Sequence, residues 1–150
     1  MKLSKKAEYA LRALLAMARA PSGTNFSIQD LARRERIPLK FLEQILLALR
    51  NGGLLRSKRG VGGGYQLQKT AAEISLLEVV RLMDGPFEPV TCSAPAGKRA
   101  VKCECGIPGG CGLGNAFATL RAQVDAWLAG TSLETVLAQE KKAETLNFEI

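Results

Sequence analysis

The 150-residue chain contains no histidine, and only 5% of its residues are aromatic. Histidine is the commonest acid–base residue of enzymes, and no other catalytic constellation is present, so the sequence argues against an enzyme. Long hydrophobic runs are also missing: none reaches the ~18 residues needed to cross a bilayer, so no membrane partner is expected. The first 20 residues superficially resemble a signal peptide, but Glu8, Arg12 and Arg19 interrupt them, which favours an amphipathic helix and a cytoplasmic protein.

Acidic residues are scarce in the first part of the chain. Residues 1–84 carry 15 Lys and Arg against seven Asp and Glu, a net charge of +8. Residues 85–150 carry six against seven, a net charge of −1. A polyanion-binding domain needs such an excess, because each neutralised phosphate releases condensed counterions. The asymmetry indicates that the N-terminal part binds nucleic acid.

The segment 37–67 predicts a helix, a tight reversal and a basic hairpin. Pro38 suits the first turn of a helix, and Gly52 with Gly53 supplies a left-handed cap at its end. Strands are expected at 54–57 and 65–67, with a tip at 58–64. Apolar residues recur between these signals at helical spacing, which predicts a buried stripe of Leu42, Ile45, Leu46 and Leu49.

The wet face of this helix carries Lys40, Glu43 and Gln44, whose hydrogen-bonding groups suit base edges in a major groove. Lys58 and Arg59 at the hairpin tip suit phosphates or a minor groove. The alternative is a helix–hairpin unit that only packs, with a solvated basic loop. The charge asymmetry favours double-stranded DNA as the partner.

The remaining signals predict a mainly α fold with a small β-hairpin wing. Ser4, Ser27 and Ser75 are helix N-caps, and the helix after Ser27 ends near Glu35, which leaves a helix-turn-helix turn before Pro38. The helix after Ser75 stops at 84–86. Residues 1–85 therefore predict a winged helix-turn-helix DNA-binding domain.

Residues 113–150 predict a long C-terminal dimerisation helix and a terminal segment. Large apolar residues recur at helical spacing from Leu113 to Leu128, followed by a short helix through Leu137. Because the preceding domain already has its own core, this stripe needs another cover. A second copy of the chain is favoured over folding back, so a homodimer is expected.

All four cysteines lie in residues 86–112, a proline-containing stretch that predicts a long cysteine-rich sensor loop. Clustered cysteines in a cytosolic chain more often bind metal or act in redox chemistry than form structural disulfides. Three interpretations stay open: an iron–sulfur cluster, structural zinc and a thiol redox switch. The cysteines are spaced as C-x10-C-x-C-x5-C, without the C-x2-4-C pairs usual for zinc: Cys92, Cys103, Cys105 and Cys111.

The motifs YALRALLAMA, FLEQIL, RGVGGGYQL and ISLLEVV resemble the Rrf-type winged helix-turn-helix transcription regulators, the IscR/NsrR/CymR-like family. The resemblance implies a homodimeric bacterial regulator that reads a palindromic DNA operator. By position, Lys40, Glu43 and Gln44 match the base-facing residues of the family's recognition helix. Arg59 matches the wing residue that meets the minor groove.

The same resemblance implies a 2Fe–2S or 4Fe–4S cluster, with Cys92, Cys105 and Cys111 as three of its ligands. The chain departs from the family pattern in the twelve residues between Cys92 and Cys105, in the extra Cys103 and in the absence of histidine. Ligation by three cysteines and a histidine is therefore excluded. Glu8 stands where some members carry an acidic ligand, so the fourth ligand is Cys103 or Glu8. A thiol-redox or small-molecule-sensing regulator without a cluster, or a protein-interaction module, are the alternatives.

Overall fold

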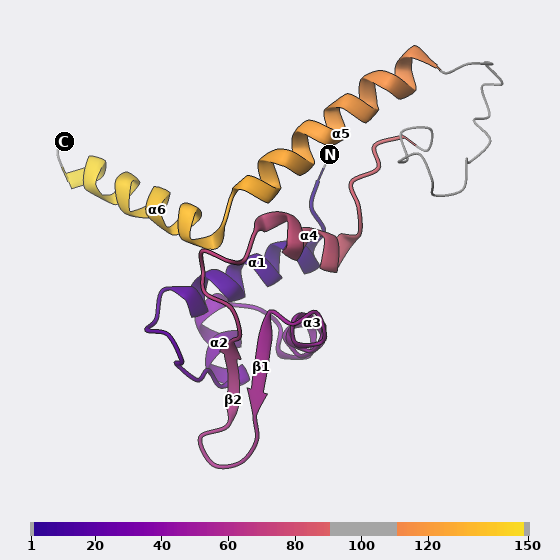
Figure 1. Ribbon diagram of the computed structural model, residues 1–150. Helices are drawn as coiled ribbons and strands as arrows, with labels where there is room; N and C mark the ends of the chain where they lie inside the picture. Colours follow the sequence, from indigo (N-terminus) through magenta and orange to yellow (C-terminus); the bar gives the residue numbers. More distant parts are fainter. Residues whose placement is uncertain (1, 91–110, 149–150) are drawn as a thin grey trace.

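The computed structural model describes residues 2–90 and 111–148 (Figure 1). These residues form six helices and one two-stranded antiparallel hairpin, so the predicted mainly α fold with a small wing is confirmed. In chain order the elements are α1 (Lys5–Ala18), α2 (Ile28–Glu35), α3 (Leu39–Asn51), β1 (Leu55–Lys58), β2 (Gly64–Leu67), α4 (Leu76–Asp84), α5 (Gly112–Gly130) and α6 (Leu133–Phe148).

The three predicted serine N-caps begin α1, α2 and α4. The hydroxyl of Ser4, Ser27 or Ser75 accepts a hydrogen bond from the backbone N–H three residues further on, at 3.1, 3.1 and 3.2 Å respectively. Each bond satisfies one of the N–H groups that a helix start leaves without an intrahelical partner. These helix starts are therefore determined locally by the sequence.

The hydrophobic core lies where α1 to α4 and the base of the hairpin meet. The inner face of α1 carries alanines, which let the neighbouring backbones approach, while α3 contributes its leucine-rich stripe. Burying each large side chain of this kind stabilises the fold by about 1.5–3 kcal/mol relative to exposure. The largest fully buried side chains are Leu14, Met17, Leu31, Leu42, Ile45, Leu46, Leu49, Leu54, Leu55, Ile74, Val79 and Leu133.

The hairpin strands begin and end about one residue away from the predicted bounds. Leu54 is fully buried, and its N–H donates to the carbonyl of Leu49 at 3.0 Å, so it belongs to the turn that follows α3. Pairing starts with Leu55 opposite Leu67 and ends with Lys58 opposite Gly64. Lys58 is therefore the last residue of β1. The sequence had placed it in the tip.

The end of α3 uses its two glycines for different reasons. Only Gly53 is left-handed, with φ of 76°, whereas Gly52 has φ of −79°. A Cβ atom at Gly52 would lie 2.6 Å from the side chain of Leu82 on α4, so packing restricts this position. At the other end, Pro38 is the N-cap of α3 and precedes its first helical residue.

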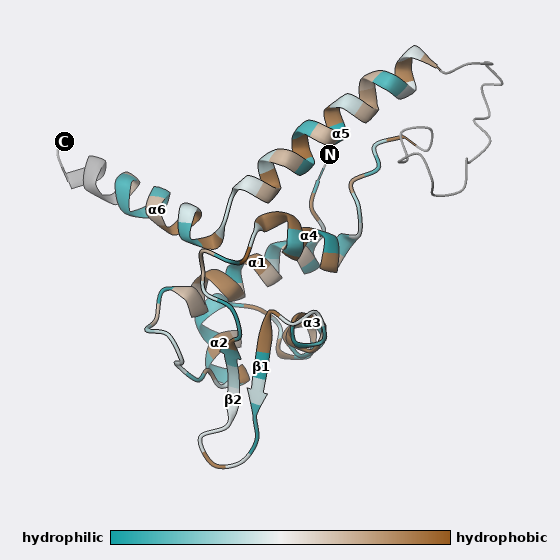
Figure 2. Cartoon of the chain, viewed as in Figure 1, coloured by the Kyte–Doolittle hydropathy of each residue, from teal (hydrophilic) through white to brown (hydrophobic). Residues whose placement is uncertain are grey.

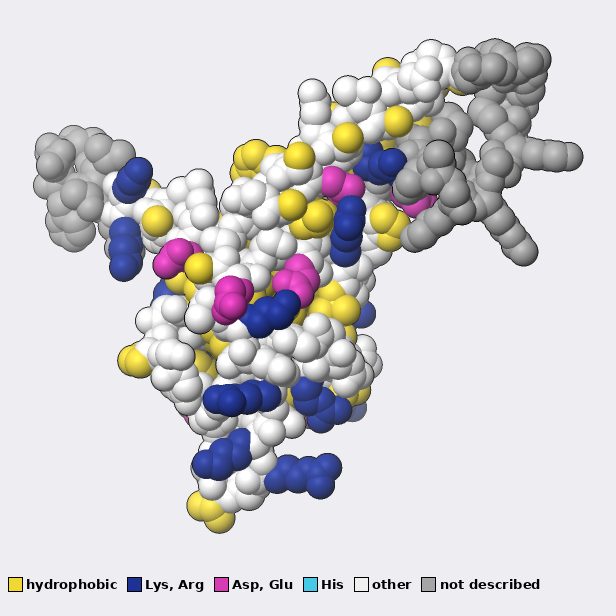
Figure 3. Space-filling model, in the orientation of Figure 1, with side chains coloured by type: hydrophobic (Ala, Val, Ile, Leu, Met, Phe, Trp, Pro, Cys, Tyr) yellow, Lys and Arg dark blue, Asp and Glu magenta, His cyan; other side chains and the backbone are white. Residues whose placement is uncertain are grey.

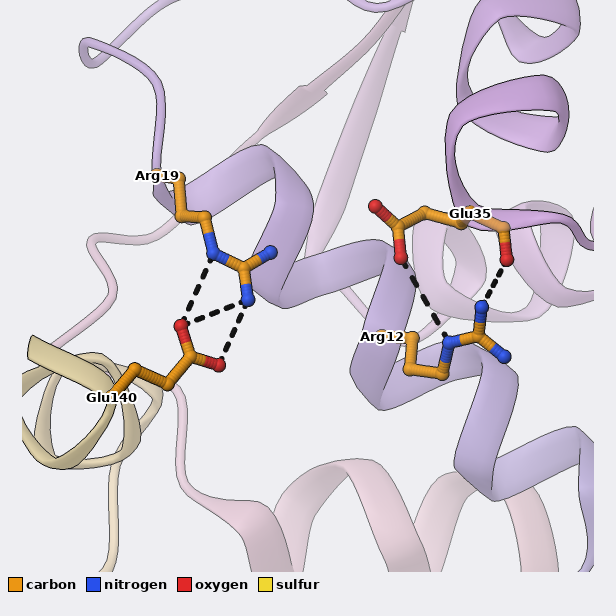
Figure 4. A network of polar contacts seen from close by, with 4 residues as sticks. All are labelled: Arg12, Arg19, Glu35 and Glu140. Carbon is orange, nitrogen blue, oxygen red and sulfur yellow. Dashed lines mark hydrogen bonds and ion pairs between the residues drawn. The ribbon is translucent and has the colours of Figure 1, made fainter. Parts of the chain in front are cut away.

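The last helix is longer than the sequence suggested. We predicted an end at Leu137, but α6 continues to Phe148. It starts against the winged domain, where the N–H of Leu133 donates to the carbonyl of Ile74 at 3.0 Å. Further along, Glu140 accepts from the guanidinium of Arg19 at 2.8 Å, which ties α6 to the end of α1 (Figure 4). The first contact joins α6 to the segment before α4, and the second joins it to the end of α1.

Helix α5 extends from the winged domain as an arm (Figure 1). Hydrophobic residues occur along its length (Figure 2), although Gly114 is its one buried residue. Where α5 meets α4, Arg81 and Asp125 form an ion pair with an N–O distance of 2.7 Å. None of the helices in the described part of the chain combines the length and apolar character needed to cross a membrane.

Candidate nucleic-acid interface

Helix α3 presents one polar stripe to solvent. Lys40, Glu43 and Gln44 are exposed, while the leucine-rich face opposite them is buried. Positions 40, 43 and 44 follow the i, i+3, i+4 spacing of neighbours on a helix surface. Within the described residues, none of the three side chains makes a hydrogen bond or an ion pair. Their donors and acceptors are therefore free for a ligand outside the chain.

The turn between α2 and α3 fixes how this stripe is presented. Helix α2 ends at Glu35, and Arg36 then takes the left-handed conformation with φ of 52°, the one described residue other than glycine with positive φ. The buried side chain of Ile37 follows, and its N–H donates to the carbonyl of Ala32 at 2.9 Å. A left-handed residue and a backbone bond thus form the predicted helix-turn-helix turn.

A side chain from α1 holds this turn in place. The guanidinium of Arg12 donates a hydrogen bond to the backbone carbonyl of Glu35, and its Nε lies 3.8 Å from the Glu35 carboxylate (Figure 4). Arg12 also lies over the ring of Tyr9, 5.5 Å from its centroid. Tyr9 in turn meets Phe41 of α3 edge to face at 5.8 Å. These contacts connect α1 to both ends of the turn.

The hairpin is anchored to the segment before α2. Phe26 and Tyr65 exchange two backbone hydrogen bonds, each of 2.9 Å, so residue 26 forms an isolated antiparallel bridge to β2. Gly64 lies so close to the carbonyl of Phe26 that a Cβ atom there would clash with it. The side-chain amide of Asn25 donates to the carbonyl of Gly62 in the tip. The wing is therefore held at its base and at its tip.

Cationic side chains cover the hairpin. Lys58 and Arg59 are exposed, Lys58 at the end of β1 and Arg59 in the tip. In the view of Figure 3 several Lys and Arg side chains surround the hairpin, and the acidic side chains of that face lie closer to the helices above. This region gives a polyanion a positive surface beside the polar stripe of α3.

One polar pair on the wing was not evident from the sequence. Arg56 lies opposite Gln66 in the strand register, and its Nε donates to the Gln66 side-chain oxygen at 3.0 Å. Strict alternation from the buried Leu55 would have placed Arg56 outward, but the expected strand started one residue too early. Arg33, Arg34 and Arg36 are further exposed cations that the analysis left out.

An apolar groove lies where the arm joins the winged domain. It has a volume of about 490 Å³, and α5 contributes Val124, Trp127 and Leu128 to its lining. The far side is formed by residues before α1, by α4 and by Phe87. The side chain of Trp127 remains 63% exposed, and Leu113 at the start of α5 is 59% exposed. The arm therefore keeps a large apolar surface that the described residues leave uncovered.

A family model described as Rrf2, iron-dependent transcriptional regulator, matches residues 3–139. The chain belongs to the Rrf2 family. A Rhodobacter capsulatus protein, named as an rrf2-like HTH-type transcriptional regulator, is 34% identical over 147 residues, covering 96% of this chain and 97% of that protein. The family model and this relative are both described as transcriptional regulators.

Two further similarities support the Rrf2 assignment and its fold. A Mycobacterium tuberculosis protein named as an HTH-type transcriptional regulator is 48% identical over 90 residues, 60% of this chain, so the match spans 56% of that relative's length. The structure of CymR, the global cysteine regulator of B. subtilis, superposes with a TM-score of 0.71 at 27% identity, covering 93% of this chain and 98% of that one. The predicted resemblance to Rrf-type regulators is thus confirmed.

Of the residues expected to hold an iron–sulfur cluster, the structure describes two. Cys92, Cys103 and Cys105 lie outside the described residues. Cys111 is a free, half-buried thiol at the N-cap of α5. Among residues 2–90 and 111–148, no three side chains of a kind that ligates metals converge.

Glu8, the other candidate ligand, lies on the partly exposed side of α1. It accepts a hydrogen bond from Lys5 at 2.7 Å, and this bond lowers the pKa of the Glu8 carboxyl below its ordinary value. The carboxylate is therefore ionised at neutral pH, as a metal ligand must be. Within one chain, Glu8 and Cys111 are on different elements, and the start of α5 extends away from the winged domain (Figure 1).

Proposed function

We propose that this protein is a homodimeric DNA-binding transcription regulator whose α3 reads the major groove and whose wing meets the adjacent minor groove. The observation that carries the proposal is the unpartnered stripe of Lys40, Glu43 and Gln44 beside the cationic hairpin. Amide and carboxylate groups of this kind discriminate base pairs, whereas the wing cations neutralise phosphates. Membership of a family of transcriptional regulators supports the same function.

A dimer follows from the uncovered apolar surface of α5. A winged helix reads few base pairs alone, and a two-fold dimer places two reading helices on half-sites about one helical turn apart. The arm is well suited to this because the Arg81–Asp125 ion pair fixes its junction with α4. We propose residues 1–85 as the DNA-binding domain, 86–112 as the sensor loop and 113–150 as the dimerisation segment.

The donor chemistry of the sensor loop fits an iron–sulfur cluster. We propose Cys92, Cys105 and Cys111 as thiolate ligands, with Cys103 or Glu8 as the fourth. When bound, such a cluster supplies an oxidant-sensitive group, and its loss or oxidation would signal the presence of oxidants in the cell. In one chain Cys111, the N-cap of α5, lies about 18 Å along the helix axis from Gln123, another residue that lines the groove. Because α5 extends away from α1, a Glu8 ligand would come from the partner subunit.

A regulator that senses thiol oxidation without a cluster is the second candidate. The half-buried free thiol of Cys111 and the likeness to CymR, a cysteine regulator, favour it. The visible absorbance of protein purified without oxygen distinguishes the two candidates. A cluster absorbs visible light and is bleached by oxygen, whereas a thiol switch is colourless and is restored by a thiol reductant.

The DNA-binding proposal is tested by selecting duplexes from a random pool with the full-length protein. We expect a palindromic sequence whose affinity falls steeply as the salt concentration rises, because phosphate contacts dominate the binding free energy. Light scattering at micromolar concentration should give about twice the chain mass of 16.1 kDa. Failure to enrich any duplex would refute the proposal, and a monomer would refute the dimer.

A further inference from the structure

The tip of the wing exposes one apolar side chain that has no role in the proposed function. Val61 has a relative exposure of 107%, the highest among the exposed large hydrophobic residues of the described chain. Such a side chain makes almost no contact within its own protein, so it contributes little to folding. A lone exposed valine is unremarkable by itself, and only its setting in the tip points to a ligand.

The backbone holds Val61 at the apex of a tight turn that is narrow because both flanking residues are glycines. Gly60 and Gly62 on either side have φ of 96° and 72°, and neither carries a Cβ atom. The N–H of Gly63 donates to the carbonyl of Gly60 at 2.9 Å, which closes the turn beneath the valine. A Cβ atom at Gly63 would lie 2.6 Å from the Lys58 carbonyl oxygen, so the tip is closed without room to spare.

A contact from outside the hairpin fixes the apex further. Asn25 donates its side-chain amide to the carbonyl of Gly62, the residue directly after Val61. The paired backbone of Phe26 and Tyr65 holds the base of β2 at the same time. The valine is therefore presented in a defined position before any ligand arrives, which reduces the entropy lost on binding.

The shape and polarity of the apex suit the minor groove of a DNA duplex. This groove is about 6 Å wide, and its walls are the deoxyribose rings, whose C–H groups are apolar. A tip with a single short side chain fits such a slot, whereas longer side chains on residues 60 and 62 would widen it. Lys58 and Arg59 directly precede the apex and supply the positive charge that the groove attracts.

We propose that Val61 enters the minor groove and packs against the deoxyribose rings, as an apolar contact beside the charged ones. The inference rests on the proposed function and adds a residue to it. Valine is apolar and β-branched, a shape that isoleucine shares, so it packs against the sugar walls of the groove. The α5 arm and the wing lie at opposite ends of the molecule in Figure 1, which separates this contact from the dimer surface.

The test compares Val61→Thr with Val61→Ile in the full-length protein, on a duplex selected by the wild type. Threonine keeps the shape of valine but has a hydroxyl in place of one methyl group, and isoleucine keeps the apolar character. We expect Val61→Thr to weaken operator binding about 3- to 10-fold, because part of one valine side chain leaves an apolar contact. Val61→Ile should bind like the wild type, and both should unfold at the wild-type temperature because the side chain is fully exposed in the described structure.

Two further readouts separate this contact from a change in charge. The slope of log affinity against log salt should stay unchanged in Val61→Thr, because no phosphate contact is lost. Hydroxyl-radical cleavage should show the wild type protecting minor-groove sugars at the wing position, and Val61→Thr protecting them less. Wild-type affinity for Val61→Thr, a changed salt slope, or an equal loss in Val61→Ile would overturn the proposal. If the wild type itself prefers no duplex, the proposed function fails instead.

Discussion

Arg12 makes two interactions at the helix-turn-helix turn, and comparing Arg12→Met with Glu35→Gln separates them. The Arg12 guanidinium donates to the backbone carbonyl of Glu35, but its Nε is 3.8 Å from the Glu35 carboxylate. The carbonyl is the last of α2 and has no partner within its own helix. If the carbonyl is the true partner, Arg12→Met should destabilise the fold clearly, whereas Glu35→Gln, which keeps the carbonyl, should not.

The magnitudes follow from the exposure of the two side chains. Losing a charged donor to a partly buried carbonyl costs about 1–3 kcal/mol. The Arg12 side chain is 39% exposed, so water replaces part of the bond, and we expect about 1–2 kcal/mol including its contact with the Tyr9 ring. The Arg12–Glu35 charge pair is open to solvent on one side, so Glu35→Gln should cost about 0.5 kcal/mol or less.

Urea denaturation of both variants at one protomer concentration measures this difference, because the stability of a dimer depends on concentration. Arg12→Met should also lower operator affinity more than affinity for random duplex, since the turn sets the direction of α3. An equal loss of unfolding free energy in Arg12→Met and Glu35→Gln would show that the carboxylate is the partner. The reasoning from the carbonyl would then be wrong.

Three other variants test the remaining parts of the proposal. Gln44→Ala should cost about 1–3 kcal/mol of binding free energy at the preferred operator and relax the sequence preference; equal losses on operator and random DNA would exclude a reading role for Gln44. Lys58→Ala should weaken binding to all duplexes alike and reduce the slope of log affinity against log salt by about 1. Trp127→Glu should give a species near 16.1 kDa in light scattering at micromolar concentration, and an intact dimer would remove this surface from the interface. Glu8→Gln and Cys103→Ser are to be reconstituted with iron and sulfide without oxygen. The variant that lacks the fourth ligand should lose cluster absorbance together with regulated DNA binding. A normal cluster in both variants would exclude both residues as the fourth ligand.

The sequence predicted those elements whose cause is local. A serine that caps a helix needs only the three residues after it, and the stripe of α3 needs only its own periodicity, so α1 to α4 were placed correctly. The exposed positions of Lys40, Glu43 and Gln44 follow from the same stripe. The length of α6 was misjudged because the segment after Leu137 has few apolar residues, and its helix is instead supported by contacts to α1.

The features that the sequence did not predict depend on partners far along the chain. Arg36 adopts a left-handed conformation that glycine or asparagine usually takes, and it does so between the buried Ile37 and the end of α2. The bond of Asn25 to the wing tip joins residues separated by 37 positions. No periodicity in a single sequence reports such a pairing, although each contact determines how the DNA-facing residues are presented.

Helix α1 joins the two halves of the proposed mechanism. Glu8 and Arg12 are separated by four residues and therefore lie on the same face of α1. Glu8 is held by Lys5 at 2.7 Å, and one turn further Arg12 holds the carbonyl that ends α2. Lys5 binds one oxygen of the Glu8 carboxylate, so a ligand bond formed by Glu8 would use the same group, one helical turn from the side chain that sets the direction of α3. Ligation by Cys103 would involve no residue of this face. Of the two candidate fourth ligands, Glu8 is thus the one with a short physical connection to the reading helix.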